Sequence, residues 1–230
     1  MSLESRVAIV TGAARGIGHA VALRLAEDGF DITINDISTS SGALDQVAQE
    51  IRAIGRRAIT ITADVSNEDE LLHCKMIANA GIAPPATPLV NTDIEKWDQV
   101  MSVNVRGVML CYKHAALQMI KQGSGGRIIG ASSILGKRGS KFVSAYCASK
   151  FAVHGLTQSL ATELAEHKIT MNTYAPGVIL TDMKTRYPST LDGPDAGPEG
   201  VASIVAYLVK PEAHFITGQT ISVNGGIFMD

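Results

Sequence analysis

Residues 6–18, RVAIVTGAARGIG, decide the fold of this chain. Residues 6–10 are a short, largely apolar and β-branched run, which is typical of a buried strand. Glycines follow at 12, 16 and 18, and from Gly16 onward apolar residues recur at helical spacing. A strand that passes through a glycine-rich turn into a helix lets the backbone amides approach a phosphate closely. The stretch therefore predicts a pyrophosphate site at the N-terminus of the first helix.

Strands and helices alternate along the rest of the chain. Strands are predicted at residues 31–35, 58–62, 75–78, 127–131, 169–174 and 219–223, and helices at 43–54, 92–122, 146–167 and about 198–208. The predicted helix 92–122 opens with TDIE, which has the form of a capping box. This alternation predicts an α/β fold with a doubly wound parallel sheet of Rossmann type, in a single domain that spans residues 1–230.

Two segments are shorter than this architecture requires. Only residues 66–74, nine in number, connect the third predicted strand to the fourth. A parallel crossover with its helix usually needs at least about 10–12 residues. Residues 184–197 are rich in Pro, Gly, Ser and Asp and show no periodic pattern. We therefore expect a shortened crossover before the fourth strand and an irregular segment late in the chain.

The composition excludes several classes of protein. The chain has 230 residues, 46% of them hydrophobic, and 20 Lys+Arg against 22 Asp+Glu give a net charge of −2. These values argue against a disordered chain and against a nucleic-acid partner. No apolar stretch approaches the ~18 residues that span a membrane, and the N-terminus does not have the pattern of a signal peptide, so a cytoplasmic protein is expected. The cysteines and histidines lack metal-ligand spacing, and no metal site is expected.

Two further patterns indicate chemistry. Asp36 ends the second predicted strand, where a carboxylate can accept both hydroxyls of an adenosine ribose and repels a 2′-phosphate. This favours NAD(H) over NADP(H), although Arg15 can offset part of the repulsion. Tyr146 and Lys150 are four residues apart on a predicted helix and so share one face, with Ser133 thirteen residues before the tyrosine. An ammonium group there lowers the pKa of a phenol, which makes Tyr146 a usable acid–base catalyst.

Taken together, these residues resemble the short-chain dehydrogenase/reductase superfamily of the classical type. The glycine motif, Asp64-Val65, Asn79-Ala80-Gly81, Asn104, Ser133, the Tyr146–Lys150 pair and Pro176-Gly177 occur in the order found in that family, from residue 6 to residue 226. One departure is Ala78, where the family usually has a first asparagine before Asn79. The other departures are the two shortened segments, which lie where the family carries a full crossover helix and a substrate loop.

The resemblance implies a role for each matching residue. Tyr146 would donate or accept the substrate proton, Ser133 would orient the substrate oxygen, and Lys150 would bind the nicotinamide ribose and lower the pKa of Tyr146. Asn104 would hold the water of a proton relay behind Lys150. The residues expected to bind the cofactor are Gly12, Arg15, Gly16, Ile17, Gly18, Asp36, Asp64, Val65, Asn79, Gly81, Tyr146, Lys150, Pro176, Gly177, Ile179 and Thr181.

The implied activity is the NAD(H)-dependent interconversion of a secondary alcohol and a ketone. Segments 125–133, 144–158 and 169–177 are most similar to the diacetyl/acetoin reductase and butanediol dehydrogenase branch, which implies a small diketone or hydroxyketone substrate. Three alternatives stay open: a β-ketoacyl reductase-like enzyme, an NADP(H)-dependent carbonyl reductase, and a catalytically impaired member that acts as a binding or scaffold protein. The resemblance also implies a homodimer or homotetramer.

Overall fold

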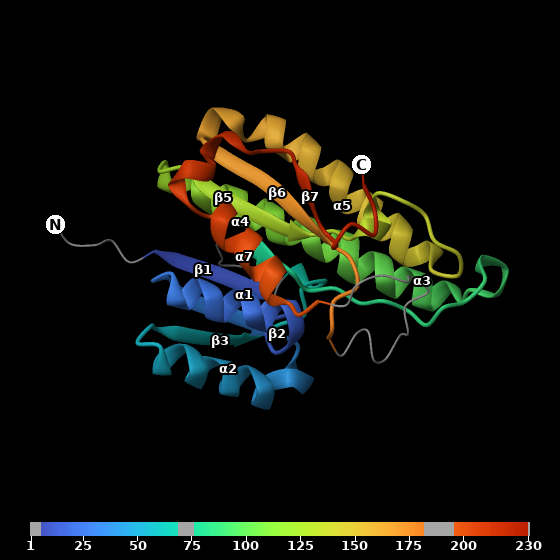
Figure 1. Cartoon of the computed structure of the whole chain (residues 1–230), viewed down its shortest axis with the longest axis horizontal. Coiled ribbons are helices and arrows are strands. Elements are labelled where there is room, and N and C mark those ends of the chain that lie inside the picture. The colour runs from blue at the N-terminus through green and yellow to red at the C-terminus, as the bar shows by residue number, and fades with distance from the viewer. Residues whose placement is uncertain (1–5, 69–75, 182–195, 230) are drawn as a thin grey trace.

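A parallel sheet of seven strands lies between two layers of helices (Figure 1). The computed structural model describes residues 6–68, 76–181 and 196–229. The strands are β1 (Val7–Thr11), β2 (Asp31–Asp36), β3 (Ala58–Thr62), β4 (Ile77–Ala78), β5 (Gly126–Ala131), β6 (Ile169–Pro176) and β7 (Thr220–Val223). Their order is β3-β2-β1-β4-β5-β6-β7, and every adjacent pair is parallel. This order reverses direction between β1 and β4, which confirms the predicted doubly wound fold.

The two helical layers cover opposite faces of the sheet. One layer contains α1 (Gly16–Glu27), α2 (Ser41–Ala53) and α7 (Glu199–Leu208), and the other contains α4 (Val108–Gln122) and α5 (Ser144–Glu163). The helix α3 (Ile94–Met101) leads into α4 through a π-helical segment, Ser102–Gly107. Short 3-10 turns lie at Ser38–Ser40, Leu89–Asn91, Ile134–Gly136, Ala165–His167 and Pro211–Phe215.

Each face of the sheet has its own hydrophobic core because alternate strand residues point to opposite sides. On the first face Val10, Ile32 and Ile34 pack beneath the helices α1, α2 and α7. On the second face Ile128 and Met171 pack with α4 and α5. The carboxyl ends of the strands form the edge of the sheet where ligands bind in such folds.

The predicted capping box at residues 92–95 is wrong in its first member. Asp93 is the N-cap of α3, and its carboxylate accepts a hydrogen bond from the Glu95 amide at 2.9 Å. The hydroxyl of Thr92 instead donates to the Pro88 carbonyl at 3.2 Å, because it closes the preceding 3-10 turn. The predicted single helix at 92–122 is otherwise confirmed, with the π-helical segment as its only irregularity among these residues.

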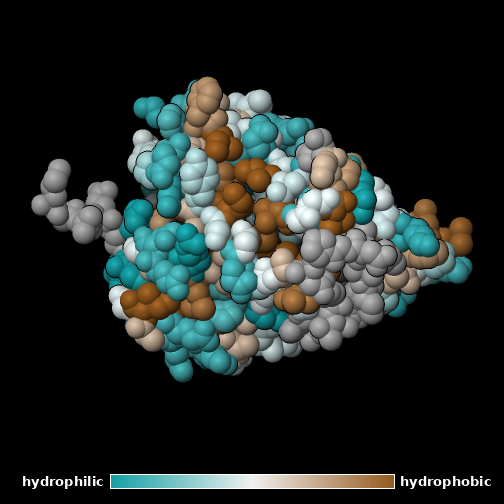
Figure 2. All heavy atoms as spheres, viewed as in Figure 1, coloured by the Kyte–Doolittle hydropathy of each residue, from teal (hydrophilic) through white to brown (hydrophobic). Residues whose placement is uncertain are grey.

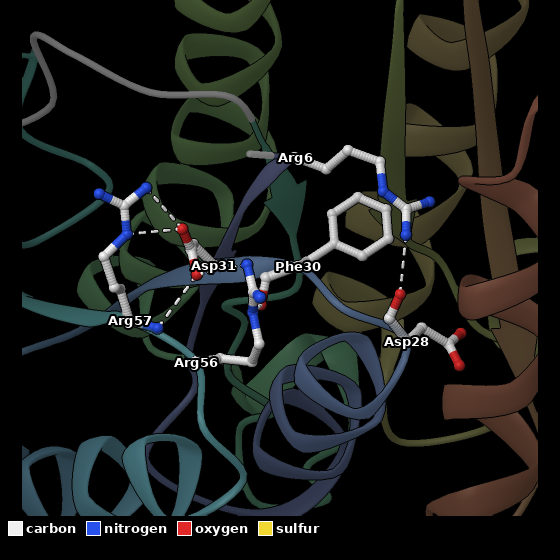
Figure 3. A network of polar contacts seen from close by, with 6 residues as sticks. All are labelled: Arg6, Asp28, Phe30, Asp31, Arg56 and Arg57. Atoms are coloured by element: carbon white, nitrogen blue, oxygen red, sulfur yellow. Dashed lines mark hydrogen bonds and ion pairs between the residues drawn. The ribbon is translucent and has the colours of Figure 1, made fainter. Parts of the chain in front are cut away.

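At the amino ends of β2 and β3, two arginines bind the carboxylate of Asp31 (Figure 3). Arg56 reaches Oδ1 at 2.7 Å, while Arg57 reaches Oδ2 at 2.6 Å through its guanidinium. Beside them Arg6 lies 4.4 Å from the centre of the Phe30 ring and donates to the Asp28 carbonyl at 2.8 Å. These contacts tie β1, β2 and β3 together at the edge opposite the expected site.

The expected shortened crossover lies mostly outside the described residues, as does the irregular segment at 184–197 except for its last two residues. What the structure does describe of the fourth strand is short, since β4 pairs with its neighbours only at Ile77–Ala78. Exposed apolar side chains gather at the tip before α3, where Leu89, Val90 and Ile94 lie (Figure 2). In the part of the chain that is described, no helix is long and apolar enough to cross a membrane.

Candidate active site

A cleft of about 320 Å³ opens at the carboxyl edge of the sheet, where β1 and β4 diverge. This is the point at which an open α/β sheet offers a crevice between its two halves. Of the residues expected from the sequence, the cleft is lined by Gly12, Arg15, Gly16, Ile17, Gly18, Asp36, Asp64, Val65, Asn79, Gly81, Tyr146, Lys150, Pro176 and Thr181. The structure therefore brings together most of the predicted cofactor and catalytic residues on one surface.

The turn between β1 and α1 needs its glycines for two physical reasons. Gly12 and Gly16 have φ angles of +64° and +57°, a region that side chains rarely adopt. Gly18 has an ordinary φ, but a Cβ atom there would overlap the Gly12 carbonyl oxygen and lie 2.6 Å from Asn79 Nδ2. The turn therefore presents bare backbone and the N-terminus of α1 to the cleft. Such a cradle fits the pyrophosphate of a dinucleotide.

The carboxylate of Asp36 is held at the far end of the cleft. Its Oδ2 accepts from the Ala14 amide at 3.1 Å, and its Oδ1 accepts from the Ile37 amide at 2.9 Å. One hydrogen bond thus joins the end of β2 to the glycine turn. Asp64 is similarly fixed, because its Oδ1 accepts from the amide and the hydroxyl of Ser66 at 2.9 and 2.8 Å. Asp36 ends β2, Asp64 follows β3, and both border the same cleft.

Tyr146 and Lys150 line the other end of the cleft, whereas Ser133 is buried beside Tyr146 and is not part of the cleft wall. Ser133 follows β5, whereas Tyr146 and Lys150 lie one turn apart on α5. The phenol of Tyr146 is hydrogen-bonded to Ser133. Lys150 Nζ lies 5.5 Å from the centre of the Tyr146 ring and donates to the Ala131 carbonyl at 2.9 Å.

The expectation that Lys150 lowers the pKa of Tyr146 is wrong for this structure. Burial raises the pKa of Tyr146 to about 12, and the hydrogen bond with Ser133 opposes this only in part. Burial also lowers the pKa of Lys150 to about 8. The reason is that both groups lose water, which disfavours their charged forms, while the ammonium is directed at a backbone carbonyl.

Asn104 lies behind the cleft rather than in its wall. Its side chain is fully buried in the π-helical segment, where Oδ1 accepts from the Ile82 amide and Nδ2 donates to the Ile82 carbonyl, both at 2.8 Å. Gly81 lies between Asn104 and Lys150, since a Cβ atom there would be 3.3 Å from Asn104 Oδ1 and 3.4 Å from Lys150 Nζ. Asn104 therefore fixes the segment next to Lys150.

Gly177 and Ile179 are not part of the cleft wall. A Cβ atom at Gly177 would be 2.9 Å from the Cα atom of Asn224, so this glycine permits the close approach of the segment after β7. Ile179 is buried and forms an isolated bridge with Ala196. Both residues have packing contacts in the structure, and their contact with the cofactor stays a prediction.

Several residues of the cleft wall were not predicted from the sequence. They are Asn35, Ile37, Ala63, Ala80, Ile82, Gln99, Val103, Ala131, Ser132 and Tyr174. Asn35, Ile37 and Ala63 adjoin predicted site residues, so position next to a strand end could have identified them. Gln99 and Val103 come from α3 and the π-helical segment, and only the packing of these elements brings them to the cleft. Among the described residues, no group of three or more His, Cys, Asp or Glu could hold a metal ion.

Comparison with known proteins agrees with this geometry. Residues 6–192 match the family model described as short chain dehydrogenase. A short-chain dehydrogenase/reductase of Armillaria gallica is 43% identical, over 99% of this chain and 97% of the relative. The 3-oxoacyl-(acyl-carrier-protein) reductase FabG of Staphylococcus aureus is 37% identical, over 98% and 99%. The crystal structure of acetoin dehydrogenase from Enterobacter cloacae has a TM-score of 0.87 and 35% identity, over 98% of this chain and 96% of that chain.

The alignment with the Armillaria relative is longer than the chain itself. It extends over 255 positions, whereas the chain has 230 residues, so at least 25 positions have no counterpart here. The chain is thus shorter than this relative although it matches nearly all of it. This agrees with the shortened segments inferred from the sequence.

Proposed function

Because this chain belongs to the short chain dehydrogenase family, an oxidoreductase family that binds nicotinamide cofactors, we propose that it uses NAD(H) to interconvert a secondary alcohol and a ketone. The observation that carries the proposal is a single cleft with a carboxylate at one end and a phenol and an amine at the other, with the Ser133 hydroxyl hydrogen-bonded to that phenol. A dinucleotide laid across the glycine turn would span the two ends. The function therefore follows from how Asp36 and Tyr146 are placed relative to that turn.

The preference for NAD(H) rests on Asp36. Two backbone amides fix its carboxylate beside the glycine turn, where the adenosine ribose would lie. A carboxylate accepts hydrogen bonds from the two ribose hydroxyls, whereas it repels a 2′-phosphate. Arg15 is exposed on the adjacent turn and lines the cleft, and its positive charge can weaken this discrimination.

The chemistry divides between the cofactor and the chain. The nicotinamide supplies the hydride in ketone reduction and accepts it in alcohol oxidation. Tyr146 gives its phenolic proton to the substrate oxygen, and the high pKa keeps that proton in place at neutral pH. Ser133, which is hydrogen-bonded to the phenol, would orient the same oxygen. Lys150, which lines the cleft one turn after Tyr146, would bind the nicotinamide ribose, and Asn104 holds the neighbouring segment in place.

A small hydroxyketone or diketone, such as acetoin or diacetyl, is the substrate class we propose. The likeness to acetoin dehydrogenase from Enterobacter cloacae supports it, as do the sequence segments around Ser133, Tyr146 and Pro176. The second candidate is a β-ketoacyl thioester, which the 37% identity to a 3-oxoacyl-(acyl-carrier-protein) reductase favours. The two candidates differ in size and not in the reacting group, so the same catalytic residues serve both.

The test compares NADH oxidation with diacetyl, acetoin and an acetoacetyl thioester, in wild type and Tyr146→Phe. We expect the small ketones to be preferred, and we expect Tyr146→Phe to lose about 10²–10⁴-fold in kcat/KM because the proton donor is gone. Preference for the thioester would select the second candidate. Activity that survives Tyr146→Phe would defeat the mechanism.

Two cofactor measurements separate the remaining alternatives. If the chain is a scaffold, fluorescence titration will detect no NADH binding even at millimolar concentration. If it is an NADP(H)-dependent carbonyl reductase, NADPH will bind more tightly than NADH in wild type. The proposal instead expects tighter NADH binding, and it expects Asp36→Ala to improve NADPH relative to NADH because the repelling charge is removed.

We also propose that the chain forms a homodimer or homotetramer. The helices α4 and α5 expose large apolar side chains, among them Leu117 at 56% and Phe151 at 46% exposure. Apolar patches on soluble proteins often mark subunit contacts. A monomeric mass by light scattering at micromolar concentration would contradict this proposal.

A further inference from the structure

The phenol of Tyr174 reaches from one half of the sheet to the other. Tyr174 lies near the end of β6 and pairs in register with Ala131 of β5. Its hydroxyl bonds to Asn79 Oδ1 at 2.7 Å, and Asn79 directly follows β4 on the far side of β5. The strand between them ends in Ala131, whose small side chain lies in the same core cluster as Tyr174 and leaves room for the ring. The contact thus links the segment that continues into Pro176 with the floor of the glycine turn.

The direction of these hydrogen bonds is fixed by their partners. Asn79 Nδ2 is 2.8 Å from the Thr11 carbonyl oxygen and 3.1 Å from the Gly12 carbonyl oxygen. Carbonyl oxygens only accept, so the amide nitrogen must face them and Asn79 Oδ1 must face Tyr174. The phenol is therefore the donor. Tyr174 itself is fully buried, so removing its hydroxyl takes this donor away from Asn79 Oδ1.

The Asn79 amide is packed tightly against the glycine turn. A Cβ atom at Gly12 would be 3.0 Å from Asn79 Nδ2, and one at Gly18 would be 2.6 Å away. The backbone at Asn79 is tied to the same turn, because its amide donates to Thr11 Oγ1 at 3.1 Å. Any rotation of the Asn79 side chain would therefore displace the Thr11 and Gly12 carbonyls. The turn keeps its shape only while the amide stays in place.

We propose that Tyr174 is a positioning residue for cofactor binding. By donating to Asn79 Oδ1 it holds the amide in the one orientation that supports the glycine turn, and so it sets the affinity of that turn for the pyrophosphate. The inference rests on the proposed function, because it assumes that the cleft binds a dinucleotide. It adds a residue from β6, on the other half of the sheet, to the determinants of pyrophosphate binding.

The test is Tyr174→Phe, which removes one oxygen atom and keeps the ring. Removing a buried hydrogen bond of this kind typically changes an equilibrium by about five- to tenfold. We expect the Kd of NADH and the Kd of ADP to rise by about that factor, while the Kd of adenosine, which lacks the pyrophosphate, stays unchanged. With NADH saturating, kcat should change less than about twofold, because binding and not proton transfer is affected. Tyr112→Phe is the matched control, since Tyr112 is equally buried but lies in α4, in the core on the other face of the sheet.

A double-mutant cycle separates positioning from a general loss of stability. In an Asn79→Ala background, Tyr174→Phe should cause no further loss of ADP affinity, because the partner is already absent. Equal Kd values for NADH in wild type and Tyr174→Phe would overturn the inference. So would an equal loss of adenosine and ADP affinity, or additive effects in the cycle. A wild-type protein that fails to bind NADH would instead refute the proposed function.

Discussion

Replacing Lys150 with methionine should stabilise the cofactor-free protein near neutral pH, because the fold buries a charge at this position. The side chain is 2% exposed, and its ammonium donates to the Ala131 carbonyl at 2.9 Å. Burial lowers the pKa of Lys150 from its ordinary value of 10.5 to about 8. In the unfolded chain the same amine returns to water and recovers its ordinary pKa.

The magnitude follows from the difference between these two values. A difference of about 2.5 at about 1.36 kcal/mol per pKa unit gives a penalty of about 3 kcal/mol for the protonated amine in the fold. Because the unfolded chain binds this proton more tightly, stability rises with pH between about 8 and 10.5, and the penalty is complete below pH 8. Methionine binds no proton. After subtracting about 1 kcal/mol for the hydrogen bond to Ala131, the variant should be more stable by about 2 kcal/mol at pH 7.

The pH dependence is the sharper part of this prediction. Between pH 7 and pH 9.5 the advantage of Lys150→Met should shrink by about 2 kcal/mol, whatever the hydrogen bond contributes. Urea unfolding of wild type and variant at both pH values, followed by circular dichroism, measures this difference directly. Lys121→Met, at an exposed position of α4, serves as the control and should show no such change. The reasoning is refuted if the free-energy difference between Lys150→Met and wild type is the same at both pH values.

Three other predictions concern separate parts of the molecule. Asp31→Asn should lower the free energy of unfolding by about 1–3 kcal/mol in urea titrations, because Arg56 and Arg57 lose the carboxylate that they bind. The Kd of NADH should stay unchanged, because the cleft lies at the opposite edge of the sheet. Gly18→Ala should abolish NADH binding in fluorescence titrations, since the overlap with the Gly12 carbonyl outweighs the helix propensity that alanine adds, about 1 kcal/mol. The rate of alcohol oxidation should rise with pH above neutrality, whereas the rate of ketone reduction should not. The reason is that burial raises the pKa of Tyr146 to about 12, and only the phenolate form can accept the proton of the alcohol. Profiles of kcat/KM against pH in both reaction directions check this.

Local patterns in the sequence predict most of the strands and the glycine turn. Strand β3 lies at the predicted residues, β2, β5 and β7 differ by one residue at one end, and β1 is shifted by one residue at both ends. This succeeds because apolar runs and glycines act on their immediate neighbours. The N-cap of α3 was misplaced at Thr92, since the sequence does not reveal that this hydroxyl already closes a turn with Pro88. The choice between two adjacent capping residues depends on the chain before them.

Contacts between distant residues are beyond such patterns. Tyr174 and Asn79 are 95 residues apart, and their hydrogen bond requires the strand order, the register of β5 with β6 and a small side chain at Ala131. The pKa of Tyr146 shows the same limit. The four-residue spacing of Tyr146 and Lys150 correctly predicts that the two residues share one face of a helix. The direction in which the pKa of Tyr146 changes depends on burial, and the spacing carries no information about burial.

The burial of Lys150 also bears on whether the chain is an enzyme or a scaffold. Domains of this kind are stable by about 5–15 kcal/mol, so a penalty of about 3 kcal/mol at one side chain is a large fraction of the total. A protein that used this fold only for binding partners would lose nothing by carrying methionine there. An amine that lines the cleft one turn after Tyr146 in spite of that cost is what the proposed catalytic site would use, since buried groups with strongly changed pKa values cluster at functional sites. The instability of this position therefore supports catalysis over a scaffold role.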